Sequence, residues 1–209
     1  MREIAEILLK IRTVSLSPSE PFTWASGIIS PIYCDNRLLL SYRKEWGEVI
    51  EALKKVILEE FPDVECIMGT AAAGIPHASV LAYLMEKPSG FVRGKAKGHG
   101  KQNQIEGKVH AGMKVVVIED LISTGGSSIE VVEALRQAGC DVLGLLSIFT
   151  YGMEKAEKAM KENDIRQVSL TDYSELLDTA LEMDYITEKD REKLKAFMDN
   201  PQDEGWRAL

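Results

Sequence analysis

The chain has 209 residues, 45% of them hydrophobic and 28% charged, which is an ordinary globular composition with enough apolar material for one sizeable core. No apolar stretch of membrane-spanning length occurs, and acids at Glu3 and Glu6 stand where a signal peptide is basic and then apolar, so we expect a cytoplasmic protein with no membrane partner. The net charge of −8 argues against nucleic-acid binding. Three distant cysteines without a CxxC pair predict reduced thiols, not disulfides or a zinc site.

Along the chain, two early amphipathic helices are predicted, one through Ile4, Ile7, Leu8 and Ile11 and one from Trp46 to Ile57, with an irregular stretch between them. Strands and helices then alternate. The predicted strands are residues 66–68, 90–92, 115–118, 142–149 and 165–170, and the predicted helices are residues 75–85, 127–138, 153–161 and 189–198. This alternation predicts an α/β fold with a central, mostly parallel sheet flanked by helices. No firm internal boundary is visible, so we expect one domain over residues 1–209.

A basic segment interrupts this acidic chain. Residues 93–110 hold five Lys and Arg and one acid, a formal +4 against −12 for the remainder, together with His99 and His110. Glycines break every apolar period between Gly94 and Gly112. The pattern favours a mobile cationic loop that closes over a small, highly charged anion; the alternative is an ordinary solvated loop.

The second glycine cluster follows the β-branched strand at 115–118. Glu119 and Asp120 come first, then a turn of small residues from Ser123 to Ser128 that opens a helix. In a parallel sheet, a helix that starts beyond the carboxyl end of a strand presents free N–H groups and a positive dipole end to an anion. Two acids beside a phosphate are understandable if hydroxyl groups or a metal lie between the acids and the phosphate, and a ribose 5-phosphate supplies such hydroxyls. The alternative is a capping acid pair at a strand end.

The sequence does not support a Walker motif, and it weakens a dinucleotide-binding interpretation. The segment from Gly69 to Pro76 has Ile75 where a Walker motif requires lysine, and no GxGxxG follows a strand. His77 has no partner at metal-ligand spacing, so a packed or surface histidine is expected.

The run VVVIEDLISTGGSS, from Val115, resembles the signature of type I phosphoribosyltransferases that binds phosphoribosyl pyrophosphate (PRPP). Three further segments resemble orotate phosphoribosyltransferases in the same order: residues 22–33, residues 69–76, and residues 93–107 with Arg93, Lys97 and His99. The likeness extends from about residue 20 to residue 150.

The resemblance implies a type I phosphoribosyltransferase fold with a small hood formed by the N- and C-terminal segments. It implies transfer of ribose 5-phosphate from PRPP to orotate, which releases pyrophosphate and forms orotidine 5′-monophosphate in UMP biosynthesis. It also implies dependence on Mg²⁺, held mainly by substrate oxygens and water without a dedicated protein metal site, and a homodimer with shared active sites. Two alternatives stay open: a phosphoribosyltransferase for another base, and a non-catalytic PRPP-sensing regulator.

Site residues follow from the same resemblance. Pyrophosphate is assigned to Arg93, Lys97 and His99, the ribose hydroxyls to Glu119 and Asp120, and the rest of PRPP to Leu121, Ile122, Ser123, Thr124, Gly125, Gly126 and Ser127. Lys97, His99 and Asp120 are the expected catalytic groups. Orotate is expected at Ser123 and at backbone N–H groups near Ser26 and Gly27. Some members carry Lys, Tyr-Lys and Arg where this chain has Ala25, Ala72–Ala73 and Tyr151, so the other orotate contacts stay open.

Overall fold

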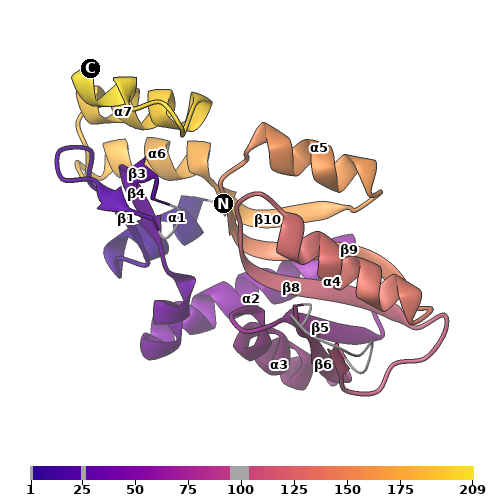
Figure 1. The fold of residues 1–209 in the computed structure, drawn as a ribbon. Coiled ribbons are helices and arrows are strands. Elements are labelled where there is room, and N and C mark those ends of the chain that lie inside the picture. The colour runs from indigo at the N-terminus through magenta and orange to yellow at the C-terminus, as the bar shows by residue number, and fades with distance from the viewer. Residues whose placement is uncertain (1, 25–26, 95–103) are drawn as a thin grey trace. The chain divides into compact units, whose positions relative to one another are not determined.

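The computed structural model describes residues 2–24, 27–94 and 104–209. Its contacts divide the chain into two compact units, one made of Met1–Tyr42 with Thr171–Leu209 and the other of Arg43–Leu170. Figure 1 shows the elements of both. No helix within the described ranges has the length and apolar character needed to cross a bilayer.

A six-stranded sheet organises the larger unit, in the order β10-β9-β8-β5-β6-β7. The strands are β5 (Cys66–Thr70), β6 (Ser89–Val92), β7 (Ile105–Glu106), β8 (Lys114–Ile122), β9 (Asp141–Thr150) and β10 (Gln167–Asp172). β6, β5, β8 and β9 pair in parallel, and β7 runs antiparallel to β6. The expected mostly parallel sheet is confirmed.

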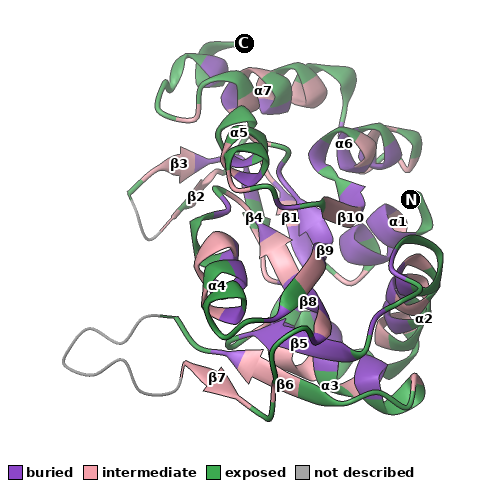
Figure 2. Ribbon diagram, turned by 90° about the vertical axis from the view of Figure 1, so that its right-hand side faces the viewer, coloured by how far each residue is buried: buried purple, intermediate pink, exposed green. Residues whose placement is uncertain are grey.

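Helices cover both faces of this sheet. They are α2 (Arg43–Glu60), α3 (Gly74–Leu84), α4 (Gly126–Gln137) and α5 (Glu154–Glu162). α2 and α3 contact each other on one face, and α4, which contacts α5, lies on the other (Figures 1 and 2). Figure 2 also shows β5 in the colour of buried residues, in agreement with the burial of all five of its residues.

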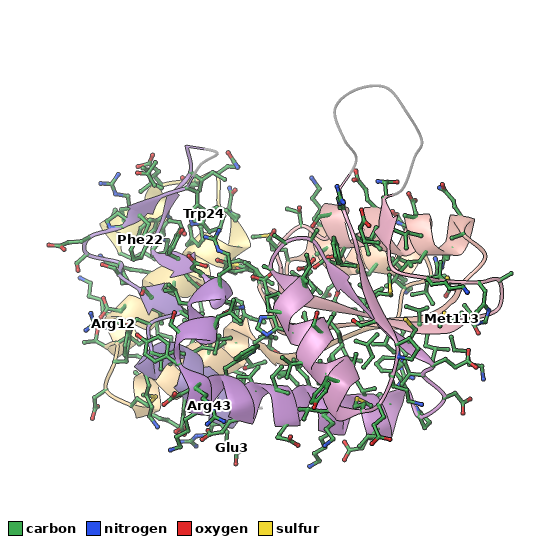
Figure 3. All side chains as sticks on the ribbon, turned by 90° about the horizontal axis from the view of Figure 1, so that it is seen from below. Glu3, Arg12, Phe22, Trp24, Arg43 and Met113 are labelled. Atoms are coloured by element: carbon green, nitrogen blue, oxygen red, sulfur yellow. The ribbon has the colours of Figure 1, made fainter. Side chains whose placement is uncertain are left out.

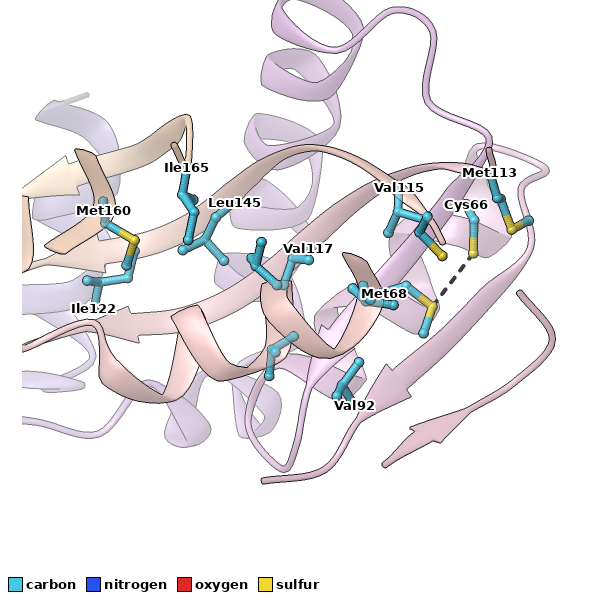
Figure 4. Packing of buried hydrophobic residues seen from close by; sticks show 14 of the residues in the cluster. Cys66, Met68, Val92, Met113, Val115, Val117, Ile122, Leu145, Met160 and Ile165 are labelled. Carbon is cyan, nitrogen blue, oxygen red and sulfur yellow. Dashed lines mark hydrogen bonds between the residues drawn. The ribbon is translucent and has the colours of Figure 1, made fainter. Parts of the chain in front are cut away.

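The central strand β8 is buried on both faces, as its β-branched run predicts. Val115, Val116, Val117 and Ile118 are all fully buried. Successive side chains of a strand point to opposite faces, so Val115 and Val117 lie on the same face and belong to one buried hydrophobic cluster (Figure 4). Helix α4 contributes Val131, Val132 and Leu135 to this cluster. This packing fixes β8 against the helix whose N-terminus follows it.

The strand order reverses beside β5. The chain adds β6 on one side of β5 and then returns to add β8 on the other. In open parallel sheets ligands bind at such a reversal, beyond the carboxyl ends of the strands, because the two connections leave a crevice there. The carboxyl ends of β5 and β8 are therefore the place to look for a site.

The smaller unit joins the two ends of the chain. It contains α1 (Arg2–Lys10), the pairs β1 (Val14–Leu16) with β4 (Ile32–Cys34) and β2 (Phe22–Thr23) with β3 (Ile29–Ser30), η1 (Asn36–Ser41), α6 (Tyr173–Glu182), α7 (Glu188–Asp199) and η2 (Gly205–Ala208). α1 packs on α6. Trp24, labelled with Phe22 in Figure 3, meets the Phe197 ring edge-on at 5.9 Å, and Phe197 meets Trp206 at 5.9 Å. The two terminal segments expected to form the hood thus fold together.

Several predicted boundaries were wrong. β8 continues to Ile122, so the acid pair lies inside the strand instead of after it, and the strand expected at 165–170 runs from Gln167 to Asp172. The stretch expected to be irregular holds β1 to β4, and the predicted glycine-rich loop contains β7. Helix α6 was missed altogether. Strands of two or three residues are too short to show a period, and only their partners stabilise them.

Two glycine-to-alanine substitutions should change stability in opposite directions. An added Cβ at Gly144 in β9 would lie 2.5 Å from Phe61 Cε1 and 2.9 Å from the Arg166 carbonyl oxygen, so Gly144→Ala should lower stability by about 1–3 kcal/mol through overpacking. Nothing lies within 4 Å of the same position at Gly47, inside α2, so Gly47→Ala should raise stability by about 0.5–1 kcal/mol. Urea unfolding of both variants checks this, and shifts of the same sign would contradict the packing at Gly144.

Candidate functional site

The phosphate loop, residues 123–128, leads from β8 into the first turn of α4 and contains a turn that needs glycine. After Ile122 the chain passes through Ser123 and Thr124 to Gly125, which has φ +79° and precedes the first helical residue, Gly126. A side chain at Gly125 would be strained by this left-handed conformation and would start 2.8 Å from the Met160 methyl carbon. The glycine lets the chain reverse between strand and helix within three residues.

The start of α4 has the properties of an anion site. The first N–H groups of a helix have no partner inside it and carry the positive end of the helix dipole. Gly125, as the N-cap residue, supplies no side chain to occupy them, and Thr124, Gly126 and Ser127 are exposed. The loop can therefore receive a phosphate group from solvent.

Glu119 points into the protein and is 6% exposed. Its carboxylate accepts hydrogen bonds from the Thr70 hydroxyl at 2.5 Å, from the Ser128 hydroxyl at 3.1 Å and from the Asp120 backbone N–H at 3.1 Å. No Lys, Arg or His in the described ranges forms an ion pair with it. The negative charge of Glu119 is thus solvated by neutral donors and is not cancelled.

Asp120 is less deeply buried than Glu119. Burial, and next the neighbouring Glu119 carboxylate, raise the pKa of Asp120 above its ordinary value of 3.8, because both disfavour a second negative charge there. Two adjacent carboxyl groups at the reversal of the strand order make a site that favours a cation, a developing positive charge or hydroxyl donors.

The turn after β5 packs tightly on the same point of β8. A Cβ on Gly74, the first residue of α3, would lie 2.3 Å from the Ile118 carbonyl oxygen and 2.6 Å from the Thr70 hydroxyl. A Cβ on Gly69 would lie 2.9 Å from the Gly74 carbonyl oxygen. Only glycines allow this approach, which brings the segment from residue 69 to residue 76 against the acid pair.

Arg93 lies just beyond β6, at the base of the basic segment. Its backbone N–H donates to Gln104 at 2.8 Å, and its guanidinium forms an exposed ion pair with Glu106 of β7. Lys97 and His99 lie outside the described residues. Arg93 follows the end of β6, and the run from Glu119 to Ser127 begins in β8 and continues past its end. These two strands lie on either side of β5.

The residues expected to bind orotate belong to both compact units. Gly27 belongs to the smaller unit, is exposed with φ +88°, and donates its N–H to the Trp24 carbonyl at 2.8 Å within the loop between β2 and β3. A pocket of about 210 Å³ beside it is lined by Gly27, Ile28, Ile29, Pro201, Gln202 and Glu204. Ser26 is outside the described residues, and Ser123 is partly exposed in the phosphate loop.

Sequence reasoning did not assign roles to Thr70 and Ser128. Both stood in quoted segments, but only the parallel register of β5 and β8 brings their hydroxyls to Glu119. His77 is packed, as expected: it is fully buried, its Nδ1 accepts from Trp46 Nε1 at 2.9 Å, and burial lowers its pKa to about 4. The described part of the chain holds no cluster of three His, Cys, Asp or Glu that could bind a metal.

Comparison with known proteins identifies the family of this chain. Residues 40–181 match the phosphoribosyl transferase domain family. An orotate phosphoribosyltransferase of Bacillus pumilus is 56% identical over 98% of this chain and 96% of its own length. The crystal structure of orotate phosphoribosyltransferase from Aeropyrum pernix superposes with a TM-score of 0.77 at 30% identity, over 88% of this chain and 99% of that one. The UMP synthase structure of Leishmania donovani has a TM-score of 0.80 at 29% identity, over 95% of this chain and 42% of its own. The chain belongs to the phosphoribosyltransferase family, among its orotate phosphoribosyltransferases.

Proposed function

We propose that the protein transfers ribose 5-phosphate from PRPP to orotate, forming orotidine 5′-monophosphate and pyrophosphate for pyrimidine biosynthesis. The observation that carries this is the uninterrupted run from Glu119 to Ser127, in which an acid pair, a glycine turn and a helix N-terminus follow one another at the reversal of the strand order. A ribose 5-phosphate has hydroxyls for the acids and a phosphate for the helix.

The proposed contacts follow this order. The loop from Ser123 to Ser127 binds the 5-phosphate, and Arg93, Lys97 and His99 bind pyrophosphate. Asp120 faces the ribose, and Glu119 acts on it less directly, through its charge. For Arg93 this requires the guanidinium to leave or share its exposed pair with Glu106, which is a weak constraint in water. Orotate contacts at Ser123, Ser26 and Gly27 stay predictions.

Charge explains the chemistry. The bond from the ring nitrogen of deprotonated orotate to the anomeric carbon forms as the bond from that carbon to the pyrophosphate oxygen breaks. In the transition state the sugar gains positive charge and the leaving group gains negative charge. The acid pair stabilises the sugar, and the cations Lys97 and His99 stabilise the leaving group. Orotate needs no strong protein base, because its own ring nitrogen is the nucleophile once deprotonated.

Mg²⁺ suits this site as a partner of the substrate. It is a hard ion that prefers oxygen ligands and retains water, and its charge supports the departing pyrophosphate. Asp120 is the partly exposed carboxylate of the acid pair and would face such an ion, and the negative charge of the neighbouring Glu119 favours a cation. We propose that PRPP oxygens and water supply most of its ligands.

We further propose a homodimer in which the basic segment of each chain completes the partner's site, and a single phosphoribosyltransferase domain that includes both compact units. The family match, which extends from residue 40 to residue 181 and so includes parts of both units, supports the latter. The cytoplasmic location stays a prediction from the sequence.

The assignment is tested by turnover. Purified protein with Mg²⁺ should consume orotate only when PRPP is present, measured as loss of orotate absorbance. Adenine, hypoxanthine and uracil serve as alternative acceptors in the same assay. Turnover of one of these bases without turnover of orotate would contradict the acceptor, and binding of PRPP without turnover of any base would indicate a sensor.

The negative charge of Asp120, which the proposed catalysis requires, should lower the stability of the folded protein. Because its folded pKa is raised, the stability linked to its bound proton is complete below pH 3.8 and is lost as pH rises through the raised value. Asp120→Asn should therefore melt at a higher temperature than wild type near neutral pH, by roughly 2–4 °C for each kcal/mol gained, and the gap should close as pH falls.

Thermal melts without PRPP and Mg²⁺ at a series of pH values measure this gap. Asp141→Asn is the matched control, because Asp141 is an exposed residue at the start of β9. A gap for Asp120→Asn that does not vary with pH would show that the raised pKa is wrong. The same variant should lose most of its activity.

Sharing of sites between subunits can be tested by mixing inactive variants. Lys97→Ala damages the segment that a chain lends, whereas Asp120→Ala damages the core that it keeps. After subunit exchange, half of the dimers are mixed and each has one intact site of two, so activity should recover to about a quarter of wild type.

A control mixture combines Lys97→Ala with His99→Ala. Both changes lie in the lent segment, so every site in this mixture receives a damaged segment and activity should not recover. If exchange is demonstrated and the first mixture stays as inactive as its components, each segment serves its own chain and the shared-site proposal fails.

A further inference from the structure

Three parts of the candidate site meet at one carboxylate. Thr70 is the last residue of β5 and precedes the turn to α3, Ser128 lies in the first turn of α4, and Glu119 lies between them in β8. The Thr70 hydroxyl donates to Oε1 of Glu119 and the Ser128 hydroxyl donates to Oε2. Each oxygen of Glu119 thus connects β8 to a different neighbouring element.

The Glu119 carboxylate has little hydrogen-bonding capacity left for a substrate. A carboxylate offers about four acceptor positions, and the Asp120 N–H takes a third. With only 6% of the residue exposed, the carboxylate is directed inward. Asp120, at the next position of the strand, is the more exposed acid.

We propose that Thr70 and Ser128 are positioning residues, which through the Glu119 carboxylate hold the turn after β5, the acid pair and the phosphate loop in one fixed arrangement. This inference rests on the proposed function, since the arrangement matters because PRPP must contact all three parts at once. None of the three side chains needs to touch the reacting atoms for this role.

Close contacts around these residues prevent the three parts from shifting independently. Thr70 also lies 3.3 Å from the Ile118 carbonyl oxygen, and the absence of a Cβ on Gly74 is what admits that oxygen and the Thr70 hydroxyl so close to the α3 N-terminus. A shift of the turn after β5 would therefore move β8 and, through Ser128, the start of α4. Misplacement by a fraction of an ångström is costly in a site that works by alignment.

The choice of hydroxyls as partners has an electrostatic reason. An Arg or Lys at these positions would hold Glu119 as firmly, but it would cancel the negative charge beside the ribose. A neutral hydroxyl stabilises the ionised carboxylate through a hydrogen bond and leaves its charge to act on the developing positive charge of the sugar. The network thus holds Glu119 rigidly without neutralising its negative charge.

Three substitutions and one control test this. Thr70→Val removes the hydroxyl at nearly constant volume, Thr70→Ser restores a hydroxyl, and Ser128→Ala removes the second donor. Ser147→Ala is the matched control, because Ser147 is fully buried and pairs in register with Glu119, but its hydroxyl bonds to Ser169 at 2.6 Å. Circular dichroism melts confirm that each variant is folded.

Steady-state kinetics with PRPP varied should separate the variants. We expect Thr70→Val and Ser128→Ala to lower kcat/KM for PRPP by about tenfold or more, the order for a lost hydrogen bond to a charged acceptor, with little change in KM for orotate. Thr70→Ser and Ser147→Ala should stay within about twofold of wild type. The pH dependence of kcat/KM should change in Thr70→Val and stay that of wild type in Thr70→Ser, because only Thr70→Val removes a hydroxyl donor from the Glu119 carboxylate.

The outcomes are distinct. If wild type turns over orotate and both donor deletions match the Ser147→Ala control in kcat/KM and pH profile, the positioning role is wrong while the function stands. If wild type does not turn over orotate, the proposed function fails, and calorimetric titration of the same variants with PRPP and Mg²⁺ tests the network by itself. Equal affinity in all variants would then overturn it, and a tenfold loss confined to the donor deletions would support it. If Thr70→Val does not fold, Ser128→Ala carries the same test.

Discussion

The structure depends on one buried carboxylate, that of Glu119, which lies on the central strand of the sheet with little exposure to water. Glu119 is buried in β8 without a described cation, and hydroxyl and backbone donors stabilise it. Burying a charge is costly unless it is fully hydrogen-bonded, so the elements that carry those donors must keep their positions. The arrangement of β5, β8 and α4 follows from that requirement as much as from apolar packing.

Close backbone approach makes this arrangement available. Gly74 lets the start of α3 lie against the Ile118 carbonyl, and Gly125 lets the chain turn from β8 into α4 in a left-handed conformation. The buried cluster formed by the valines of β8 and α4 then holds strand and helix together behind the turn. The acid pair and the phosphate loop are therefore held rigidly, which suits the proposed catalysis by preorganised charge.

The acid pair also shows why a functional site can weaken a fold. Glu119 and Asp120 are adjacent, and burial together with mutual repulsion raises the pKa of Asp120. An unliganded protein tolerates this because its large apolar core supplies the stability elsewhere. In the proposed reaction the ribose of the donor becomes positive, and a positive group beside the acid pair reduces this repulsion. The stability that the two carboxyl groups cost the unliganded fold is thus offset when the transition state forms.

The sequence by itself determined the fold class and the phosphate loop, because a β-branched run, two acids and a glycine turn are local patterns that need no distant partner. It could not show that Glu119 is directed inward, since Thr70 is 49 positions away and reaches it only through the parallel register of β5 and β8. That the first 42 residues fold with the last 39 was expected only from the resemblance and not from local patterns, because short strands and the Trp24–Phe197–Trp206 contacts acquire stability only when both ends of the chain meet. Neighbouring residues along the chain therefore predict a local motif, whereas hydrogen-bond partners and burial depend on which strands lie side by side in the sheet.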